Sequence, residues 1–391
     1  MGCLFSSKPL RGGLATVFFL SGIVATLTIW LDRQPWTGVL QGLILMLAAG
    51  CAASFRSMLA AAAIPGWGIL QLTLQRTSVP WDTLQAVLYW AALAATYLLA
   101  AAFFQNGRFH KKFLSAAAVF ALALCVASTL QFFTSEGRYF WIWQAVEPQV
   151  FGPFQSRNNY ASFALLMLPV VLWRAVKHPT TDWMWLAAAA ILAASVISSG
   201  SRAGSLLVAM ELLLFVWLTR RKAGGFVLGG GALFLVAMGI TGWDALSYKI
   251  QDQDPWRYRR EMMTSAARMA ADRPASGYGL GTYPRIYPAY AAFDSGHFVN
   301  HAHNDWAEWA AEGGLPFVCL LMGLAIYTLP ACLRNPWGIG VPAVYLHALV
   351  DYPFQRLGVA FWVVVMVAAV LWAPRVSTAS AESASASSVH G

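Results

Sequence analysis

The chain has 391 residues, of which 58% are hydrophobic and only 11% are charged, and its mean hydropathy is +0.56. This composition excludes a soluble domain, because too few polar residues are present to cover a single hydrophobic core. The net charge of +9 does not indicate nucleic-acid binding, because the basic residues form no continuous stripe and are divided between the two predicted faces of a membrane.

Apolar segments recur along the chain at lengths that suit membrane helices. About 20 apolar residues, at 1.5 Å each, cross roughly 30 Å of hydrocarbon. The sequence therefore predicts an all-α fold, a polytopic membrane helix bundle of about 12 transmembrane helices. The predicted spans are 13–31, 36–55, 57–75, 81–104, 112–133, 160–176, 183–199, 203–219, 224–241, 305–330, 337–351 and 356–373. Pro65 makes 57–75 the least regular of them.

These spans predict a single polytopic membrane domain over residues 1–373. The serine- and alanine-rich segment 374–391 is expected to be a disordered cytoplasmic tail. The five cysteines form no CxxC pair and show no metal-ligand spacing, so we expect no disulfide framework, redox pair or zinc site.

Lysine and arginine are more numerous in the loops of one predicted face than of the other. With a cytoplasmic N-terminus, the short inward loops hold thirteen of these cations and the short outward loops hold six, so both termini are predicted to be cytoplasmic. The long segment 242–304 then lies outside as a partly helical loop, and twelve of the thirteen outward cations are arginine. Because arginine pairs bidentately with phosphate, this face suits an anionic ligand such as a diphosphate. Any single arginine there can instead contact lipid headgroups.

The segment HAHNDWAEWAAEGGLP (301–316) brings histidines and carboxylates together in front of a predicted span. We expect a helix to begin near Asn304 or Asp305, because acidic first-turn residues complement the positive end of a helix dipole. His303 then lies at the outer aqueous boundary, where a neutral imidazole can accept a proton from a hydroxyl. Asp305 or a neighbouring carboxylate can fix its tautomer. His301 and His303 can alternatively cap the helix or bind interfacial water.

Three carboxylates of this segment, Asp305, Glu308 and Glu312, share one helix face at positions i, i+3 and i+7. A carboxylate is costly in hydrocarbon, so this face must line a protein cavity or the outer water. The same cost applies to Glu211 in the middle of another span. Glu211 is therefore either a buried structural carboxylate or part of a proton relay.

Polar residues also gather at the outer ends of three other spans. SSGSRAGS (198–205) carries Arg202, HALVDYPFQR (347–356) carries His347 and Asp351, and GPFQSRNNYASF (152–163) carries Arg157, Asn158 and Asn159. Several polar clusters on one face of an otherwise apolar protein indicate a functional site.

The segment RYRREMMTSAARMAADRPASGYGLGTY (257–283) predicts an amphipathic helix that ends before Pro274 and is followed by a glycine-rich turn. The glycines of the turn are Gly277, Gly279 and Gly281. The candidate substrate-binding residues of this segment, beside Arg259, are Arg257, Arg260 and Tyr283.

The ordered set SRAG, ADRPASGYGLGTY, HAHNDWAEWAAEGGLP and HALVDYPF, over residues of about 150–360, resembles the O-antigen ligase and polymerase superfamily. The resemblance implies a bacterial inner-membrane glycosyltransferase that takes a glycan from undecaprenyl diphosphate on the periplasmic side, without nucleotide sugar, metal or cofactor. It implies that His303, Arg202 and Arg259 are catalytic. Two residues, both in the long outer loop, differ from the family pattern. Met263 stands where many members have tryptophan, and Arg273 stands where members often have histidine.

The resemblance and the residue chemistry together define the expected site. His303 is expected to deprotonate an acceptor hydroxyl, while arginines stabilise the charge that develops on the leaving diphosphate. The expected substrate-binding residues are Arg157, Asn158, His301, Asn304, Asp305, Glu312, Arg257, Arg260, Tyr283, His347 and Asp351. The expected partners are an undecaprenyl-diphosphate-linked glycan donor, a glycan or lipid A core acceptor, and membrane lipids.

Other functions stay open at this point. Within the superfamily, a polymerase of O-antigen or exopolysaccharide is nearly as well supported as a ligase, and a protein O-oligosaccharyltransferase less so. A polysaccharide or lipid transporter is the alternative of a different class, but no internal repeat supports it. A metal-dependent transferase would use Asp252 and Asp254, which the topology places outside, where nucleotide sugars are not expected.

Overall fold

A computed structural model describes residues 8–31, 35–49, 55–145, 150–177, 182–219, 256–294, 296 and 298–373. The elements are α1 (Lys8–Leu27), α2 (Pro35–Ala49), α3 (Phe55–Thr73), α4 (Pro80–Phe104), α5 (Gly107–Thr134), β1 (Arg138–Tyr139), β2 (Trp143–Gln144), α6 (Arg157–Lys177), α7 (Asp182–Ser198), α8 (Arg202–Thr219), α11 (Arg257–Asp272), α12 (Tyr283–Ile286), η1 (Tyr287–Ala289), α13 (Asp305–Arg334), η2 (Pro336–Gly338), α14 (Gly340–His347), η3 (Pro353–Gln355) and α15 (Leu357–Leu371). The expected all-α class is confirmed for these ranges, and the antiparallel hairpin β1–β2 is a small addition.

The helix α15 is the centre of the bundle. It packs against α1, α4, α6, α13 and α14, and most of its side chains are buried. A helix that is hydrophobic on every side must be surrounded, as α15 is. Gly22 of α1 and Gly358 of α15 allow these two helices to approach each other closely, because a Cβ at either position would lie within 3 Å of an atom of the other helix. Trp362 donates a hydrogen bond of 2.8 Å to the Thr26 hydroxyl across the same interface.

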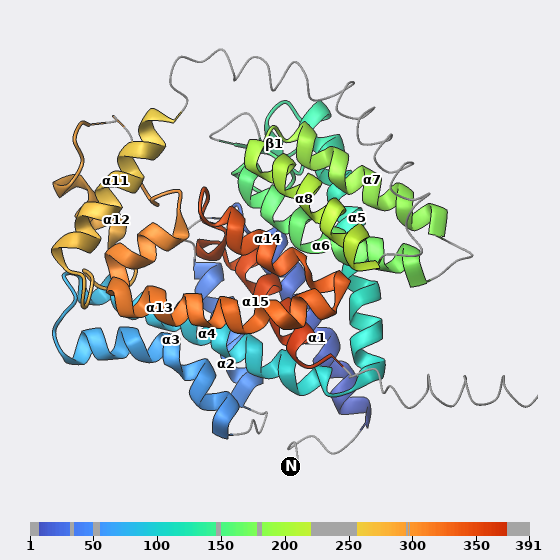
Figure 1. The fold of residues 1–391 in the computed structure, drawn as a ribbon, viewed down its shortest axis with the longest axis horizontal. Coiled ribbons are helices and arrows are strands. Elements are labelled where there is room, and N and C mark those ends of the chain that lie inside the picture. Colours follow the sequence, from blue (N-terminus) through green and yellow to red (C-terminus); the bar gives the residue numbers. More distant parts are fainter. Residues whose placement is uncertain are drawn as a thin grey trace, which may run out of the picture.

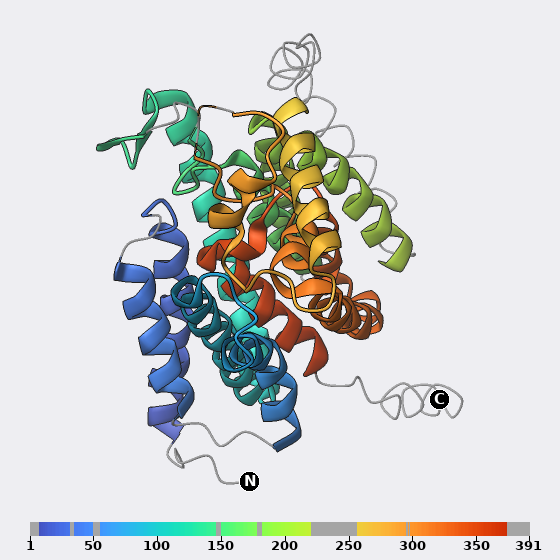
Figure 2. The same ribbon diagram turned by 90° about the vertical axis from the view of Figure 1, so that its left-hand side faces the viewer.

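Two groups of helices flank this centre (Figure 1). One group contains α2, α3 and α4, and the other contains α6, α7 and α8, with α14 packed on α6 and α8. The long helix α13 contacts α3, α14 and α15, and it carries α11 on its first part. In Figure 2, α1 begins and α15 ends at the lower side of the bundle, while α11 and the hairpin lie at its upper side. The candidate site therefore occupies the end of the bundle opposite to these two helix ends.

The described helices support a polytopic membrane protein. Five are long and apolar enough to cross a bilayer, namely α4, α5, α6, α8 and α13, and α1, α2, α7 and α15 contain shorter apolar segments. The expected helix at 57–75 forms as α3 and continues through Pro65. The prediction for 337–351 is wrong, because this segment folds into η2 and the eight-residue α14, which is about 12 Å long and too short to span. The predicted span 224–241, the start of the long loop and the tail 374–391 lie outside the described residues.

Candidate active site

The first turn of α13 sets the geometry of the site. Asn304 caps the helix, and its side-chain oxygen accepts a hydrogen bond of 3.0 Å from the N–H of Ala307. The predicted helix start is therefore confirmed. His303, directly before the cap, has a φ of +51°, a left-handed conformation that is unfavourable for residues other than glycine. Such strain is retained where the surrounding structure requires a side chain at one position.

His303 faces a buried carboxylate. Its Nδ1 lies 3.9 Å from Oδ1 of Asp351, an electrostatic contact that is too long for a direct hydrogen bond. The other oxygen of Asp351, Oδ2, accepts a hydrogen bond of 2.7 Å from the side chain of Asn159. Neither Nδ1 of His303 nor Oδ1 of Asp351 has a hydrogen-bond partner within the part of the chain that the structure describes. Since Nδ1 faces the carboxylate, Nε2 is the nitrogen left for a ligand.

Asp351 is held in its charged form by its surroundings. Burial by itself would raise the pKa of this carboxyl, but the contact with His303 and the electrostatic influence of His347 and Arg259 outweigh burial and lower its pKa below the ordinary value. His347 is buried behind it, and its Nδ1 lies 2.7 Å from the Ser162 hydroxyl. The site therefore contains a histidine beside a carboxylate whose lowered pKa favours its ionised form.

His301 forms a second histidine–carboxylate pair. Its Nδ1 lies 2.9 Å from Oε1 of Glu308, which is shorter than the contact between His303 and Asp351. The ring of His301 stacks on Tyr352, with centroids 4.5 Å apart, and His303 meets the same tyrosine edge-on at 4.8 Å. Tyr352 thus lies against both imidazoles and restricts their orientation.

The three carboxylates on one face of α13 are turned into protein, as the cost of a carboxylate in hydrocarbon requires. Each accepts a hydrogen bond from a backbone N–H of a neighbouring segment: Asp305 from Phe354, Glu308 from Ala302, and Glu312 from Tyr283. Asp305 or a neighbouring carboxylate was expected to fix the tautomer of His303, and the oxygen of Asp305 binds the segment after Asp351 instead. The carboxylate beside His303 is therefore the one at position 351.

A break in α13 attaches the segment after α11 to the bundle. Gly314 has a φ of +72°, which interrupts the helix and frees the carbonyls before it. The carbonyl of Ala311 accepts a hydrogen bond of 3.0 Å from the N–H of Tyr278, and that of Glu312 accepts one of 2.9 Å from Gly279. The glycine-rich turn thus satisfies backbone groups that the break leaves without helical partners.

Gln71 of α3 holds the same turn from the other side. Its side-chain amide donates to the carbonyls of Ser276 and Glu312, at 2.6 and 2.8 Å, and its oxygen accepts from the N–H of Leu280 at 3.1 Å. Gly277 has a φ of +64°, and a Cβ there would lie 2.2 Å from the carbonyl oxygen of Glu312. The turn therefore requires glycine, and its position fixes where α11 ends.

Three arginines from separate helices meet beside the histidines. Arg202 begins α8, and Arg259 lies in the first turn of α11. Their guanidinium carbons lie 5.9 and 5.5 Å from the ring centroid of Trp256, and both charges act on Arg157, the first residue of α6. Among the described residues, neither Arg202 nor Arg259 forms an ion pair with a carboxylate. Like charges gathered in this way repel one another, so the arrangement favours binding of an anion.

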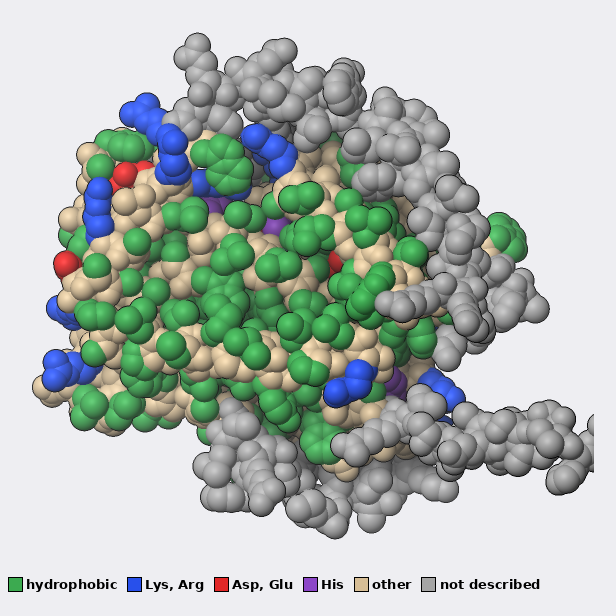
Figure 3. Space-filling model, in the orientation of Figure 1, with side chains coloured by type: hydrophobic (Ala, Val, Ile, Leu, Met, Phe, Trp, Pro, Cys, Tyr) green, Lys and Arg blue, Asp and Glu red, His purple; other side chains and the backbone are tan. Residues whose placement is uncertain are grey.

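The surface of this end of the molecule reflects the same grouping. In Figure 3, lysine and arginine side chains gather at the upper left over α11, and histidine side chains are visible next to them. Arg259 acts electrostatically on Asp351, so the arginines lie near the pair of His303 with Asp351.

The remaining predicted residues lie around this site in different environments. Arg257 and Arg260 are exposed on α11, where Arg257 lies 4.7 Å from the ring centroid of Phe293. Tyr283 is buried and donates a hydrogen bond of 3.0 Å to the Met262 carbonyl. Asn158 is also buried, next to Asn159. In the described part of the chain, no group of His, Cys, Asp or Glu side chains has the arrangement of a metal site. The pair Asp252 and Asp254 lies outside the described residues.

Sequence reasoning missed Trp256 and Tyr352. Trp256 directly precedes the basic helix, and Tyr352 directly follows Asp351, so adjacency to predicted site residues is the signal that could have found them. Asn159 was recognised only as part of a polar cluster, and its contact with Asp351 depends on a partner 192 residues away.

Part of the chain matches a protein-family model. Residues 187–322 match the family model described as O-antigen ligase. The match covers about a third of the chain, from within α7 to just past the middle of α13, and leaves Arg157, His347 and Asp351 outside. No curated protein matches the chain. The match supports the resemblance to the O-antigen ligase and polymerase superfamily, over the region that carries Arg202, Arg259 and both histidines.

Proposed function

We propose that this protein transfers a glycan from a polyprenyl diphosphate, undecaprenyl diphosphate in a bacterial inner membrane, to an acceptor hydroxyl on the periplasmic side. The observation that carries the proposal is the grouping of Arg157, Arg202 and Arg259 beside the pair of His303 with Asp351. A cluster of guanidinium groups suits a diphosphate, and a histidine oriented by a carboxylate suits proton removal from a hydroxyl.

The reaction follows from these positions. Nε2 of His303 takes the proton of the acceptor hydroxyl, and the hydroxyl oxygen bonds to the anomeric carbon of the donor sugar. The bond from that carbon to the diphosphate breaks, and the diphosphate leaves with its charge stabilised by the arginines. Asp351 stabilises the imidazolium that forms. Attack on the face opposite to the leaving group inverts the anomeric configuration.

We assign the two histidines different roles, although His301 has the shorter carboxylate contact. Arg259 influences the charge of Asp351, the partner of His303, so His303 is the histidine coupled to the arginine cluster. His301 is fixed between Glu308 and Tyr352, and we propose that it shapes the acceptor side. We propose that Asp305, Glu312 and Tyr283 support the loops around the site, because their polar atoms bind backbone groups.

The acceptor distinguishes a ligase from a polymerase. We place a ligase that uses lipid A core slightly ahead of a polymerase that extends another lipid-linked glycan. Deleting the gene and separating the surface polysaccharide on a gel decides between them. Loss of polymer from the lipid A core, with long lipid-linked chains accumulating, indicates a ligase, and single repeat units still attached to the core indicate a polymerase. An unchanged polysaccharide would contradict both.

A biochemical test addresses the donor directly. Purified protein in detergent is incubated with a polyprenyl-diphosphate-linked glycan and an acceptor glycan, and the released polyprenyl diphosphate is measured. The proposal expects release that depends on the acceptor and disappears in Arg202→Ala. Undiminished release by Arg202→Ala would contradict the role given to the arginine cluster.

A further inference from the structure

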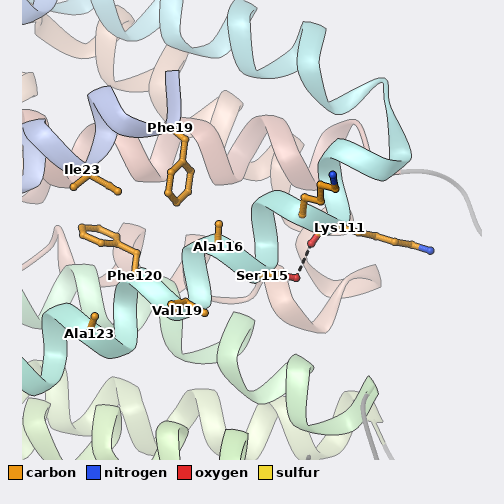
Figure 4. A pocket seen from close by; sticks show the side chains of 9 residues that line it. Phe19, Ile23, Lys111, Ser115, Ala116, Val119, Phe120 and Ala123 are labelled. Atoms are coloured by element: carbon orange, nitrogen blue, oxygen red, sulfur yellow. Dashed lines mark hydrogen bonds between the residues drawn. The ribbon is translucent and has the colours of Figure 1, made fainter. Parts of the chain in front are cut away.

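A second binding feature lies away from the catalytic end of the bundle. An open groove of about 710 Å³ runs between α1 and α5 (Figure 4). Its walls are mainly apolar, with Phe19 and Ile23 on the α1 side and Val119 and Phe120 on the α5 side. A groove of this kind between two membrane helices has the shape and polarity to hold an acyl chain.

One end of the groove is basic. Lys111 and Lys112, in the first turns of α5, both line it, and both are exposed. Neither forms an ion pair with a carboxylate in the described ranges, and the first turn of α5 contains no acidic residue. Two exposed lysines without a carboxylate partner among the described residues therefore lie where the apolar groove begins.

We propose that this groove binds an anionic glycerophospholipid. The phosphate of the headgroup lies at Lys111 and Lys112, and an acyl chain lies along the apolar wall between α1 and α5. Basic pockets between membrane helices bind anionic headgroups in this way, because the lysine stems cover apolar surface while their ammonium groups reach the phosphate. The distribution of loop charges predicts a cytoplasmic position for both lysines, where the anionic lipids of the leaflet lie.

The position of the groove argues against the glycan donor as its ligand. α5 has 28 residues and is about 42 Å long, and the two lysines lie near its first residue. The other end of α5 is near the arginine cluster, because Gln131 donates a hydrogen bond to the carbonyl of Gly152, close to Arg157. A diphosphate held at Lys111 would therefore be far from His303.

Native mass spectrometry of the full-length protein in detergent tests the proposal. Phosphatidylglycerol and phosphatidylcholine with the same acyl chains are added separately, and the fraction of protein retaining lipid is compared. We expect phosphatidylglycerol to be retained preferentially, and the double variant Lys111→Gln/Lys112→Gln to lose about tenfold or more in its apparent affinity. Arg108→Gln is the matched control, since Arg108 is basic, exposed and close in sequence but does not line the groove.

A second variant separates lipid binding from general surface charge. Val119→Trp fills the exposed groove and keeps both lysines, so it should weaken retention of phosphatidylglycerol while leaving the melting temperature without lipid unchanged. Equal retention of the two lipids by the native protein would overturn the proposal. An equal loss in Arg108→Gln and the double variant would overturn it as well, and so would displacement of phosphatidylglycerol by a polyprenyl diphosphate.

Discussion

Replacing Asp351 by asparagine removes one charge from the site and changes the side-chain shape very little. At 3.9 Å and an effective dielectric constant of about 20, a carboxylate and an imidazolium attract each other by about 4 kcal/mol. The side chain of His303 is 28% exposed, so water screens part of this attraction. We therefore expect Asp351→Asn to remove roughly 2–3 kcal/mol of the stabilisation of the imidazolium, which lowers kcat about 30- to 150-fold.

The assay measures initial rates of glycan transfer by purified protein over a range of donor concentrations. Asp351→Asn should lower kcat and leave the KM for the donor nearly unchanged, because the carboxylate acts on the charge formed at His303. In a His303→Ala background the same substitution should cause no further loss, since the group that it stabilises is absent. Asn159→Ala keeps the charge of Asp351 and removes one hydrogen bond, so its effect should be smaller, less than about tenfold.

A kcat for Asp351→Asn within threefold of the native value would refute this reasoning, and so would an equal additional loss in the His303→Ala background. The pH dependence of stability provides an independent measurement. The pKa of Asp351 is lowered on folding. The ionised carboxylate therefore contributes to the free energy of unfolding at pH values above the ordinary aspartate pKa of about 3.9, and this contribution is lost as the pH falls through the lowered pKa. The difference in melting temperature between the native protein and Asp351→Asn should therefore narrow only at strongly acidic pH.

Four other predictions follow from the site. His303→Ala should reduce transfer to a low residual rate at unchanged protein level, with His301→Ala milder, and the reverse order in the transfer assay would exchange their proposed roles. Trp256→Ala removes two cation–π contacts of about 0.5–1 kcal/mol each and should raise the KM for the donor about tenfold. The KM of Trp256→Phe should lie between those of the native protein and Trp256→Ala, and an unchanged KM in Trp256→Ala would contradict a positioning role. Gly277→Ala should lower the melting temperature far more than Gly296→Ala, because both glycines have positive φ but only position 277 is crowded; equal shifts would contradict this. Transfer should continue in excess EDTA, and a loss restored by magnesium or manganese would instead support the Asp252–Asp254 pair.

The local features of the site could be predicted because they depend on nearby residues. Asn304 and the acidic first turn determine the start of α13, and Pro274 determines that α11 ends before it. The positive φ values of Gly277 and Gly279 follow from their place in a tight turn. Hydrophobic length and the scarcity of charge were sufficient to identify a polytopic α-helical membrane protein.

The sequence alone determined the membrane class, the helix starts and the set of polar residues at one end of the bundle. The tertiary structure decided which of those residues meet. Asp305 is two residues from His303 and was one of the carboxylates expected beside it, yet its carboxylate binds the N–H of Phe354, and Asp351 lies nearest to the imidazole nitrogen Nδ1. The segment 337–351 similarly reads as a span by hydrophobicity but folds into the short α14. Hydrophobic periodicity reports local burial, whereas contacts between residues 48 or more positions apart depend on how whole helices pack, which no local pattern encodes.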